Sequence, residues 1–251
     1  MRLPAALFAL HLAVHASLHA AWTFSATETR PAPPGLEFVQ CQANDGKNNA
    51  QLHIVSFSTR THSLAVMDNP KGDFDAARAA EKRGALAAVN GGYFHPDRTP
   101  LGLVVRQGVE IHPLEKARLL NGIVVVAKGE VALRRPAEFK ASAAVREALQ
   151  AGPFLIDGGK AVAGLDSTRR AARTVVFTDG AGHCGVLICK SVTLAQMAAL
   201  LATPGAFAGG EISRALNLDG GSSTALWVRG EPPFYVREWK SVRNYLAIVP
   251  R

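Results

Sequence analysis

Residues 88–94 read AVNGGYF, and residues 216–224 read LNLDGGSST. Each segment begins as a short apolar run, which predicts a buried strand, and then turns through a polar residue and two glycines. Glycine allows a ligand or another backbone to approach closely, and consecutive free N–H groups in such a turn form a nest that binds an anion. The two segments therefore predict two polar turns at strand ends, where a binding site can form.

Strand-like patterns dominate the rest of the chain, and some are joined by hairpin turns such as Lys128-Gly129. Helices are expected at residues 75–83, 141–150 and 193–201, the last with Thr193 as its N-cap. No linker divides two cores. The pattern predicts an α+β fold, a single domain with a largely antiparallel or mixed sheet and a few inserted helices. The expected strands lie at residues 35–44, 50–58, 86–90, 102–107, 123–126, 131–133, 154–156, 174–178, 185–189, 216–218, 224–228 and 244–249.

The N-terminal region differs from the rest of the chain. Residues 1–20 combine a positive start at Arg2, an apolar centre and small residues near the end, which is the layout of a secretory signal peptide. Residues 21–34 are expected to form a Pro-rich, extended lead-in to a folded domain at residues 35–251. We therefore expect an exported protein, periplasmic or secreted. No later segment is long and apolar enough to cross a membrane, so stable membrane insertion is not expected after removal of the signal.

The cysteines Cys41, Cys184 and Cys189 are odd in number, and their spacing is not that of a metal site. Cys184 and Cys189 lie five residues apart in an expected strand, so their side chains should point to opposite faces and not bond to each other. In an oxidising compartment, a disulfide between Cys41 and either of them remains possible. Because no cluster of metal-ligating residues is evident, neither a metal nor another cofactor is expected.

The chain of 251 residues has a formal net charge of +8, from 28 Lys and Arg against 20 Asp and Glu. Such a charge attracts anionic substrates or polyanionic surfaces. Apart from the pairs Arg134-Arg135 and Arg169-Arg170, the basic residues are scattered, and no nucleic-acid recognition motif accompanies them. The charge pattern therefore favours an anionic sugar-phosphate or glycan as partner and argues against nucleic acid.

The second Gly-Gly turn carries most of the candidate chemistry. Asp219 would place a carboxylate at the rim of a strand, where a substrate can reach it. Gly220 and Gly221 would form the anion nest, and the hydroxyls of Ser222 and Ser223 would add donors. An Asp-Gly-Gly sequence is also a common turn with no chemical role. The functional interpretation therefore depends on an ordered set of motifs and not on this turn alone.

That ordered set is Asn-Gly-Gly-Tyr-Phe at residues 90–94, Leu101-Gly102, Gly152-Pro153, Arg173-Thr174, Leu-Asp-Gly-Gly-Ser-Ser at residues 218–223, and Arg243. In this order the motifs resemble the phosphodiester glycosidase family, and the likeness covers about residues 50–250. The sequence departs from the family pattern at Ser222, where relatives commonly have a third glycine. The forty N-terminal residues show no resemblance.

The resemblance implies hydrolysis of a sugar 1-phosphodiester at its glycosidic carbon, which releases free sugar and a phosphomonoester. A phosphate leaving group is a weak base, so it needs charge stabilisation more than a general acid. Arg173 and Arg243 would supply it, because guanidinium matches phosphate oxygens in a two-pronged geometry. Gly91 and Gly92 would bind the substrate or its phosphate together with the second turn. An arginine at either position could equally be part of a structural ion pair.

A sugar cation-like transition state also requires a nearby carboxylate. Asp219 is the first candidate, as nucleophile, base or electrostatic stabiliser, and Asp157 is the second. Asn90 could hydrogen-bond a sugar hydroxyl or orient Asp219. The expected catalytic set is therefore Asp219, Arg173 and Asn90.

Two other functions stay open at this point. A phosphodiesterase that cuts at phosphorus would use the same nest and arginines. A non-catalytic exported module would bind anionic envelope glycans without turnover.

Overall fold

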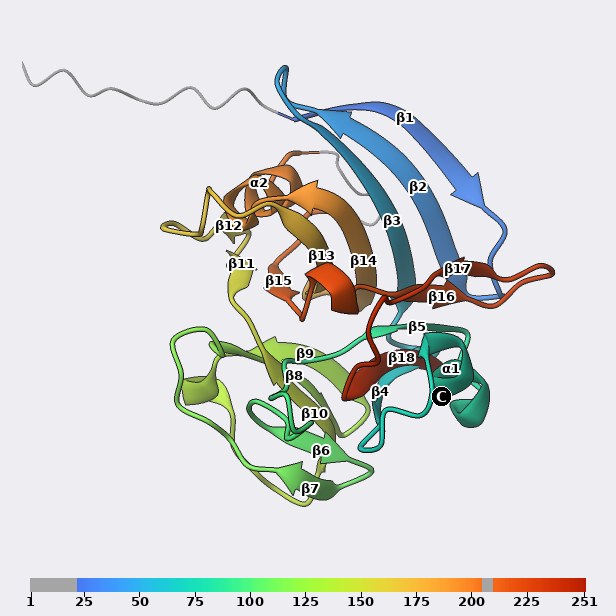
Figure 1. Ribbon diagram of the computed structural model, residues 1–251, viewed down its shortest axis with the longest axis vertical. Coiled ribbons are helices and arrows are strands. Elements are labelled where there is room, and N and C mark those ends of the chain that lie inside the picture. The colour runs from blue at the N-terminus through green and yellow to red at the C-terminus, as the bar shows by residue number, and fades with distance from the viewer. Residues whose placement is uncertain (1–21, 205–209) are drawn as a thin grey trace, which may run out of the picture.

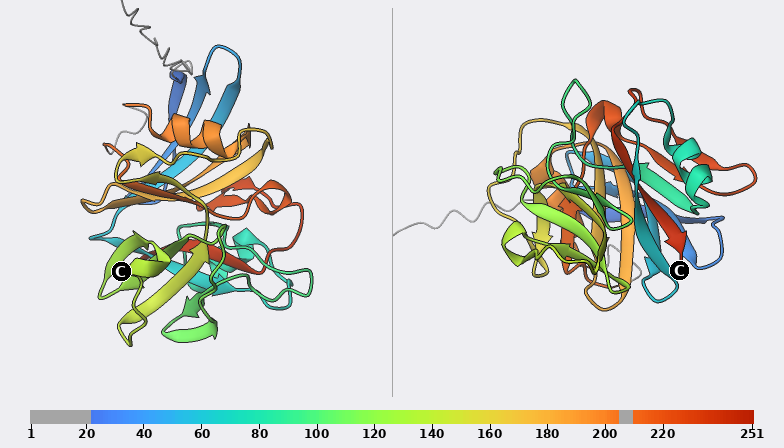
Figure 2. Two further views of the ribbon diagram at one scale, coloured as in Figure 1. Left: turned by 90° about the vertical axis from the view of Figure 1, so that its left-hand side faces the viewer. Right: turned by 90° about the horizontal axis from the view of Figure 1, so that it is seen from below.

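The computed structural model of the chain describes residues 22–204 and 210–251, so the expected signal peptide at residues 1–20 lies outside the described residues. The described part folds into three sheets with only antiparallel strand pairs, two α-helices and two short 3-10 helices. Figure 1 shows the eight-stranded sheet in the upper half of the molecule and the two five-stranded sheets below it. The side view in Figure 2 shows the same two layers.

The large sheet is strongly curved, and its central strands β3 and β14 pair over seven residue positions. Its inner face is apolar and turns toward the two smaller sheets, whereas helix α2 covers part of its outer face. In spatial order the strands are β1 (Thr23–Arg30), β2 (Leu36–Asn44), β3 (Asn49–Ser58), β14 (His183–Val192), β13 (Ala171–Thr178), β15 (Arg214–Asn217), β11 (Phe154–Asp157) and β12 (Lys160–Ala161).

The two smaller sheets complete the opposite layer. The first has the order β7 (Val109–His112), β6 (Val104–Arg106), β10 (Val145–Ala151), β8 (Gly122–Ala127) and β9 (Glu130–Arg134). The second has the order β17 (Phe234–Val236), β16 (Leu226–Val228), β5 (Ala87–Asn90), β18 (Asn244–Pro250) and β4 (His62–Asp68).

Both α-helices lie where the sequence predicts them, and Thr193 is the N-cap that the sequence indicates. Helix α1 (Ala76–Arg83) starts after Asp75, whose side chain accepts from a backbone N–H in the first turn. Helix α2 (Leu194–Leu201) starts after Thr193, which forms a capping box with Gln196. Within the described residues, no helix has the length and apolar character that crossing a membrane would require. The short helices are η1 (Pro136–Glu138) and η2 (Gly221–Ser223).

One apolar cluster joins all three sheets. It includes Val186 and Leu216 from the large sheet, Val124 from the first small sheet, and Val89 and Leu246 from the second. Each of these side chains is at most 2% exposed. Burial of apolar surface between layers is the main stabilising force of such a fold. The layers therefore share one core.

The fold is richer in strands than the expected α+β class, and the helix expected at residues 141–150 is wrong. Its alanines and glutamate favour a helix locally, but Val145–Ala151 forms strand β10 between β6 and β8. Five consecutive side chains from Glu147 to Ala151 are buried there. Burial on both faces of a central strand outweighs the weak local propensity.

The described residues 22–34 of the expected lead-in belong in large part to the large sheet. Strand β1 pairs with β2 from Thr23↔Asn44 to Arg30↔Phe38, with one register shift near Phe24. Trp22 is 4% exposed and packs in the outer apolar cluster. The segment therefore adds an edge strand to the sheet.

All three thiols are free and buried, and the strand register explains why. Cys41 on β2 and Cys189 on β14 are both partners of Leu52 on the intervening strand β3. Two strand spacings separate them by about 9.5 Å, beyond the roughly 7 Å between Cα atoms that a disulfide tolerates. Cys184 packs in the inner cluster and Cys189 in the outer one, as the predicted opposite faces require.

We predict that the shared core makes the protein unfold in one cooperative transition. Leu216→Ala and Leu246→Ala remove the same group from different sheets, and each should lower the free energy of unfolding by about 2–5 kcal/mol. Both should shift the same single transition in urea, followed by far-UV and near-UV circular dichroism. Two transitions, each moved by only one of the variants, would show two independent folding units.

Candidate active site

The two Gly-Gly turns lie side by side although about 130 residues separate them. The Asp219 N–H donates to the Gly91 carbonyl at 3.0 Å, and the Asn90 side-chain amide donates to the Asp219 carbonyl at 2.7 Å. In Figure 1, β5 and the short helix η2 that follows the second turn both lie at the junction between the large sheet and the smaller sheets. The fold thus brings the two sequence motifs into one site.

Asn90 acts inside the protein. It is fully buried, and its side-chain oxygen accepts from the Thr174 hydroxyl at 2.6 Å and from the Ala225 N–H at 3.1 Å. Its amide nitrogen is bound to the Asp219 carbonyl. Of the two roles considered for Asn90, the geometry matches orientation of the Asp219 turn.

The first turn has no free anion nest. The Gly91 N–H donates to the Asn244 carbonyl at 2.9 Å, and the Gly92 N–H donates to the Asn244 side-chain oxygen at 2.8 Å. A Cβ atom on Gly91 would lie 2.0 Å from that same oxygen, so only glycine allows this contact. Gly91 and Gly92 therefore shape the site, and their N–H groups are already engaged.

The Asp219 carboxylate is partly buried at the mouth of the second turn. Its Oδ1 accepts from the Gly220 N–H at 2.8 Å, and the Ser223 hydroxyl hydrogen-bonds to the carboxylate. Burial raises the pKa of Asp219 above its ordinary value, although these two hydrogen bonds and the nearby Arg169 oppose the shift. A carboxyl group held in this way is typical of functional sites.

The second turn keeps two N–H groups available. Within η2 the Ser223 N–H donates to the Gly220 carbonyl and the Thr224 N–H to the Gly221 carbonyl. Among the described residues, the N–H groups of Gly221 and Ser222 donate no hydrogen bond. Gly221 has a φ of 62°, the left-handed conformation that turns successive N–H groups to the same side. The sequence predicts the nest at Gly220 and Gly221, but the Gly220 N–H is engaged by the Asp219 carboxylate, so the free pair of N–H groups is that of Gly221 and Ser222.

Arg173 on β13 is a buried cation with no paired carboxylate. It is 8% exposed, and its guanidinium donates to the carbonyls of Val192 at 3.0 Å and Arg169 at 2.7 Å. No carboxylate oxygen of residues 22–204 or 210–251 lies within 4.0 Å of it. Burial lowers the pKa of Arg173. Such a charge is stabilised when an anion binds beside it.

The Arg173 strand packs directly on the second turn. A Cβ atom on Gly220 would lie 2.6 Å from the Ala172 carbonyl, and the Leu218 N–H donates to the Thr174 carbonyl at 2.8 Å. The glycine is therefore required for close approach between the backbones. The strand and the turn carry the buried cation and the carboxylate into the same region.

Two residues that were absent from the expected site also lie here. The Tyr93 hydroxyl donates to the Gly152 carbonyl at 2.7 Å and accepts from Asn217 at 2.9 Å, and both burial and Asp219 raise its pKa. Arg169 is exposed and acts electrostatically on Asp219, Tyr93 and Arg173. The Arg169-Arg170 pair close before Arg173 was the available signal for the second cation.

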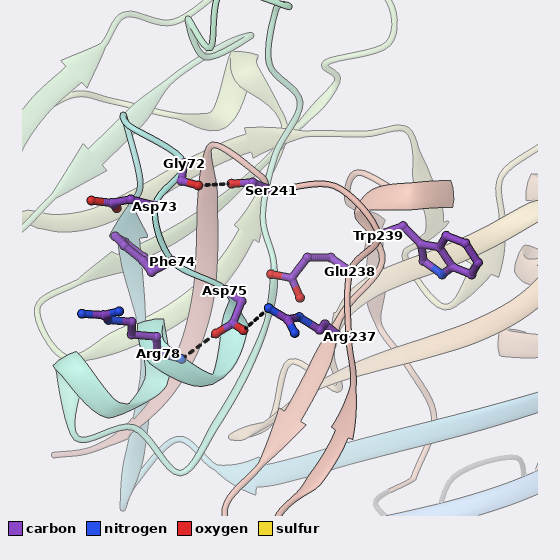
Figure 3. Close-up of a pocket in the computed structure, with 9 residues that line it drawn as sticks. All are labelled: Gly72, Asp73, Phe74, Asp75, Arg78, Arg237, Glu238, Trp239 and Ser241. Carbon is purple, nitrogen blue, oxygen red and sulfur yellow. Dashed lines mark hydrogen bonds and ion pairs between the residues drawn. The ribbon is translucent and has the colours of Figure 1, made fainter.

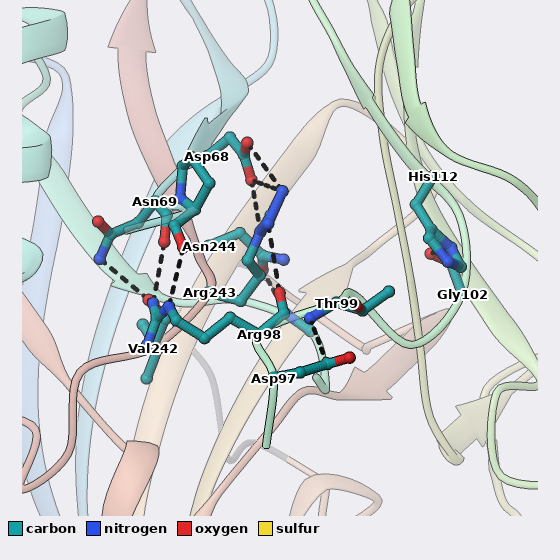
Figure 4. Close-up of polar contacts among 12 residues, drawn as sticks. Asp68, Asn69, Asp97, Arg98, Thr99, Gly102, His112, Val242, Arg243 and Asn244 are labelled. Carbon is teal, nitrogen blue, oxygen red and sulfur yellow. Dashed lines mark hydrogen bonds and ion pairs between the residues drawn. The ribbon is translucent and has the colours of Figure 1, made fainter. Parts of the chain in front are cut away.

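Arg243 is already paired with another carboxylate. Its guanidinium contacts Asp68 through two nitrogens, Nε at 3.0 Å and Nη2 at 2.9 Å, and also donates to the Arg98 carbonyl at 3.2 Å. Figure 4 shows the Arg243 side chain extended toward Asp68. Both side chains are 10% exposed. Arg243 therefore stabilises the junction of β4 and β18, and its neighbour Asn244 holds the first turn.

The second carboxylate candidate is also paired. Asp157 at the end of β11 accepts from Arg135 at 2.7 Å and from Arg214 at 2.9 Å. It thus belongs to a network of ion pairs at the rim of the large sheet. In the described part of the chain, no group of three or more His, Cys, Asp or Glu side chains is placed to hold a metal ion.

The site thus combines a carboxylate and two free N–H groups on one turn with a buried guanidinium on the strand that packs against this turn, at the strand ends of an antiparallel β fold. The family model described as NAGPA, phosphodiester glycosidase, matches residues 83–249. That range covers more than half of the chain and contains both turns. The protein belongs to the phosphodiester glycosidase family. No curated protein matches the chain.

Solved structures share the fold at low sequence identity. The catalytic domain of zebrafish N-acetylglucosamine-1-phosphodiester alpha-N-acetylglucosaminidase, auto-inhibited by its pro-peptide, has a TM-score of 0.65 and 18% identity over 92% of this chain and 89% of that one. A hypothetical protein from Synechocystis has a TM-score of 0.63 and 17% identity over 90% of this chain. Our chain spans 64% of that protein.

A third structure is more distant. A putative exported protein from Burkholderia pseudomallei K96243 has a TM-score of 0.54 and 14% identity, over 80% of this chain and 74% of its own. At these identities the three structures show a shared fold and nothing more.

We predict a pH-dependent gain in stability for Asp219→Asn. Because the folded protein raises the pKa of Asp219, the stabilising contribution of this group is fully present below its unfolded value of about 3.8 and is lost as pH rises through the folded pKa. Asparagine has no charge to bury, and its oxygen can still accept from Gly220. The variant should therefore be more stable than the wild type at pH 7, by a margin that shrinks below pH 4.

Urea unfolding of both proteins at several pH values measures this difference, since other titrating groups cancel between them. A variant less stable than the wild type at pH 7 would contradict the assignment of Asp219 as a carboxyl group whose ionised form is disfavoured by burial. A difference in unfolding free energy that does not change with pH would contradict it as well.

Proposed function

We propose that this protein is an exported hydrolase that cleaves the glycosidic bond of a sugar 1-phosphodiester and releases free sugar and a phosphomonoester. The observation that carries the proposal is the Asp219 carboxylate on a turn that also has two free N–H groups, with the strand of the unpaired Arg173 packed against this turn. Family membership supports the same type of reaction.

Binding of the phosphodiester would rely on the nest and the arginines. The N–H groups of Gly221 and Ser222 can donate to one phosphate oxygen, and the Arg173 charge can be compensated by the phosphate. Arg169 adds a second, exposed cation nearby. All these groups stabilise negative charge, which grows on the leaving phosphate as the bond breaks.

Asp219 would act on the sugar side of the reaction. The bond between the anomeric carbon and the phosphate oxygen breaks, and its electron pair leaves with the phosphomonoester. The positive charge that develops at the anomeric carbon is stabilised by the carboxylate, which either attacks this carbon or assists a water molecule. The water finally provides the hydroxyl group of the free sugar, and its other proton is released to the phosphate or to solvent.

A single carboxylate suffices for this chemistry. Glycosidases that release an alcohol use a second carboxyl group to protonate the leaving oxygen. A phosphomonoester leaves as a stable anion, so this proton is not required. The name of the zebrafish enzyme describes a substrate of this kind, an N-acetylglucosamine 1-phosphodiester, which is the first compound to test.

The first test follows oxygen from labelled water. Purified protein and the methyl phosphodiester of α-N-acetylglucosamine 1-phosphate should yield free sugar, with the label at the anomeric oxygen. Mass spectrometry of both products locates it. Label in the phosphate would instead indicate a phosphodiesterase that cuts at phosphorus, and binding without turnover on a panel of sugar 1-phosphodiesters would indicate a non-catalytic module.

Asp219→Asn should lower kcat on the order of 100-fold or more, because it removes the charge that stabilises the transition state. Arg173→Gln should reduce kcat/KM strongly while the protein stays folded. The matched variant Arg243→Gln should instead lower the thermal midpoint, since it leaves Asp68 buried and unpaired. Near-normal turnover in folded Asp219→Asn would overturn the role of the carboxylate.

We also propose that residues 1–20 direct export to the periplasm or the medium. The mature protein should lack about the first 20 residues, as measured by the intact mass of protein recovered from the periplasm or medium. A mature form that retains Met1, or protein confined to the cytoplasm, would contradict this proposal.

A further inference from the structure

A cavity of about 210 Å³ borders the second turn. Strands β3, β13 and β14 of the large sheet form one wall, and η2 with the segment from β17 to Trp239 forms the other. Gly221 lines the cavity, so the nest residue beside Asp219 is also part of its wall. Pockets for whole ligands measure roughly 300–1,000 Å³. This cavity is smaller, and it suits one ring of a larger molecule.

His53 provides an unused polar group at this cavity. The residue is 5% exposed, and its Nδ1 is buried without a hydrogen-bond partner among the described residues. Aromatic rings of Phe38 and Phe234 pack beside it. Burial, with a contribution from Lys190, lowers the pKa of His53 to about 4, so the ring is neutral at pH 7 and has one donor and one acceptor. A buried polar atom without a partner requires an explanation. Because Nδ1 itself has almost no accessible surface, a ligand hydroxyl in the cavity would have to reach the ring through its small exposed part.

Trp239 provides an aromatic surface at the same cavity. Its side chain is 91% exposed, whereas Trp22 and Trp227 are almost completely buried. Figure 3 shows the Trp239 indole directed away from the other labelled side chains. An exposed indole next to a cavity commonly marks a binding surface.

The backbone around Trp239 is held in place from two sides. The Trp239 N–H donates to the Ser222 carbonyl at 2.9 Å. The preceding Glu238 is buried and accepts from the Tyr245 hydroxyl at 2.6 Å and from the Ala76 N–H at 3.0 Å. The backbone that carries the indole is therefore held in a fixed position, and it is hydrogen-bonded directly to the turn after Asp219.

The charges at the cavity indicate the kind of ligand. Lys190 and Arg237 line it and no carboxylate does. Arg237 is paired with Asp75 at 3.0 Å, whereas Lys190 has no ion pair in the described part of the chain. The apolar wall residues include Ile188 and Val236. An aromatic face, a neutral hydrogen-bonding group and a positive rim suit a carbohydrate ring that carries a phosphate.

We propose that this cavity is a subsite for one pyranose ring of the substrate, with the ring stacked on Trp239, a hydroxyl group bonded to His53, and the attached phosphate at Gly221 and Ser222. The proposal rests on the function proposed above. The C–H bonds on one face of a pyranose pack against the π face of an indole. The ring is either the sugar that is cleaved or a sugar on the leaving side, since both offer this chemistry.

Binding can be measured without turnover. Because Trp239 is the exposed tryptophan, iodide should quench mainly its fluorescence. α-N-Acetylglucosamine 1-phosphate should protect the wild type from quenching, and inorganic phosphate should protect it much less. Trp239→Phe, which keeps an aromatic ring, should retain affinity within a few fold by calorimetry, whereas Trp239→Ala should lose about tenfold or more. Val109→Ala, another exposed apolar residue, is the control and should change nothing.

Kinetics then locate the ring. If the cleaved sugar occupies the cavity, Trp239→Ala should raise KM both for a methyl phosphodiester and for a hexose 6-phosphodiester. If the sugar on the leaving side occupies it, the variant should raise KM only for the hexose 6-phosphodiester. Either result supports the subsite. His53→Leu should weaken binding of α-N-acetylglucosamine 1-phosphate more than His53→Gln does, whereas the two variants should have the same thermal midpoint.

Two results separate the subsite from the reaction. Turnover with unchanged KM in Trp239→Ala for both substrates, and no protection from iodide, would overturn the subsite and leave the proposed function intact. Protection that depends on Trp239 in a protein with no turnover would refute the reaction and retain the sugar site. Absence of both turnover and protection would refute both.

Discussion

The side-chain amide of Asn90 joins three parts of the fold at one buried point. It donates to the Asp219 carbonyl and accepts from the Thr174 hydroxyl and the Ala225 N–H. These partners belong to the second turn, to the large sheet and to the approach to β16, whereas Asn90 ends a strand of the second small sheet. A buried polar group left without its partner costs about 1–3 kcal/mol. The position of Asp219 therefore depends on how the layers meet.

The site combines groups that folding alone does not favour. Arg173 is buried without a carboxylate, and the pKa of Asp219 is raised by burial. Arg243 and Asp157 show the opposite arrangement, because each has an oppositely charged partner within 3 Å. The contrast separates charges that stabilise the fold from charges that are available to a ligand. Groups with unfavourable environments of this kind concentrate at functional sites.

Much of the fold followed from local patterns. Alternation and turn residues located most strands, and the helices expected at residues 75–83 and 193–201 are both present. The error at residues 141–150 arose because an alanine-rich run favours a helix until long-range pairing decides. The packing of three sheets around one core depends on contacts between distant residues, which no local pattern reports.

The candidate site was predicted in part for the same reason. The sequence placed Asn90 and Asp219 on similar turns, and the structure puts these turns in contact. Whether an N–H is free depends on tertiary contacts, so Asn244 as the acceptor at Gly91 and Gly92 could not be foreseen. The same holds for the Asp68 partner of Arg243 and for the role of Trp239, which no motif marks.

The central claim is that the second turn and Arg173 together form a phosphate site beside Asp219. A crystal structure of the protein with α-N-acetylglucosamine 1-phosphate tests this most directly. We predict phosphate oxygens within hydrogen-bond distance of the Gly221 and Ser222 N–H groups, with the Arg173 guanidinium next to the phosphate and the anomeric carbon facing Asp219. A phosphate bound at other surface arginines, with this turn empty at saturating ligand, would contradict the account.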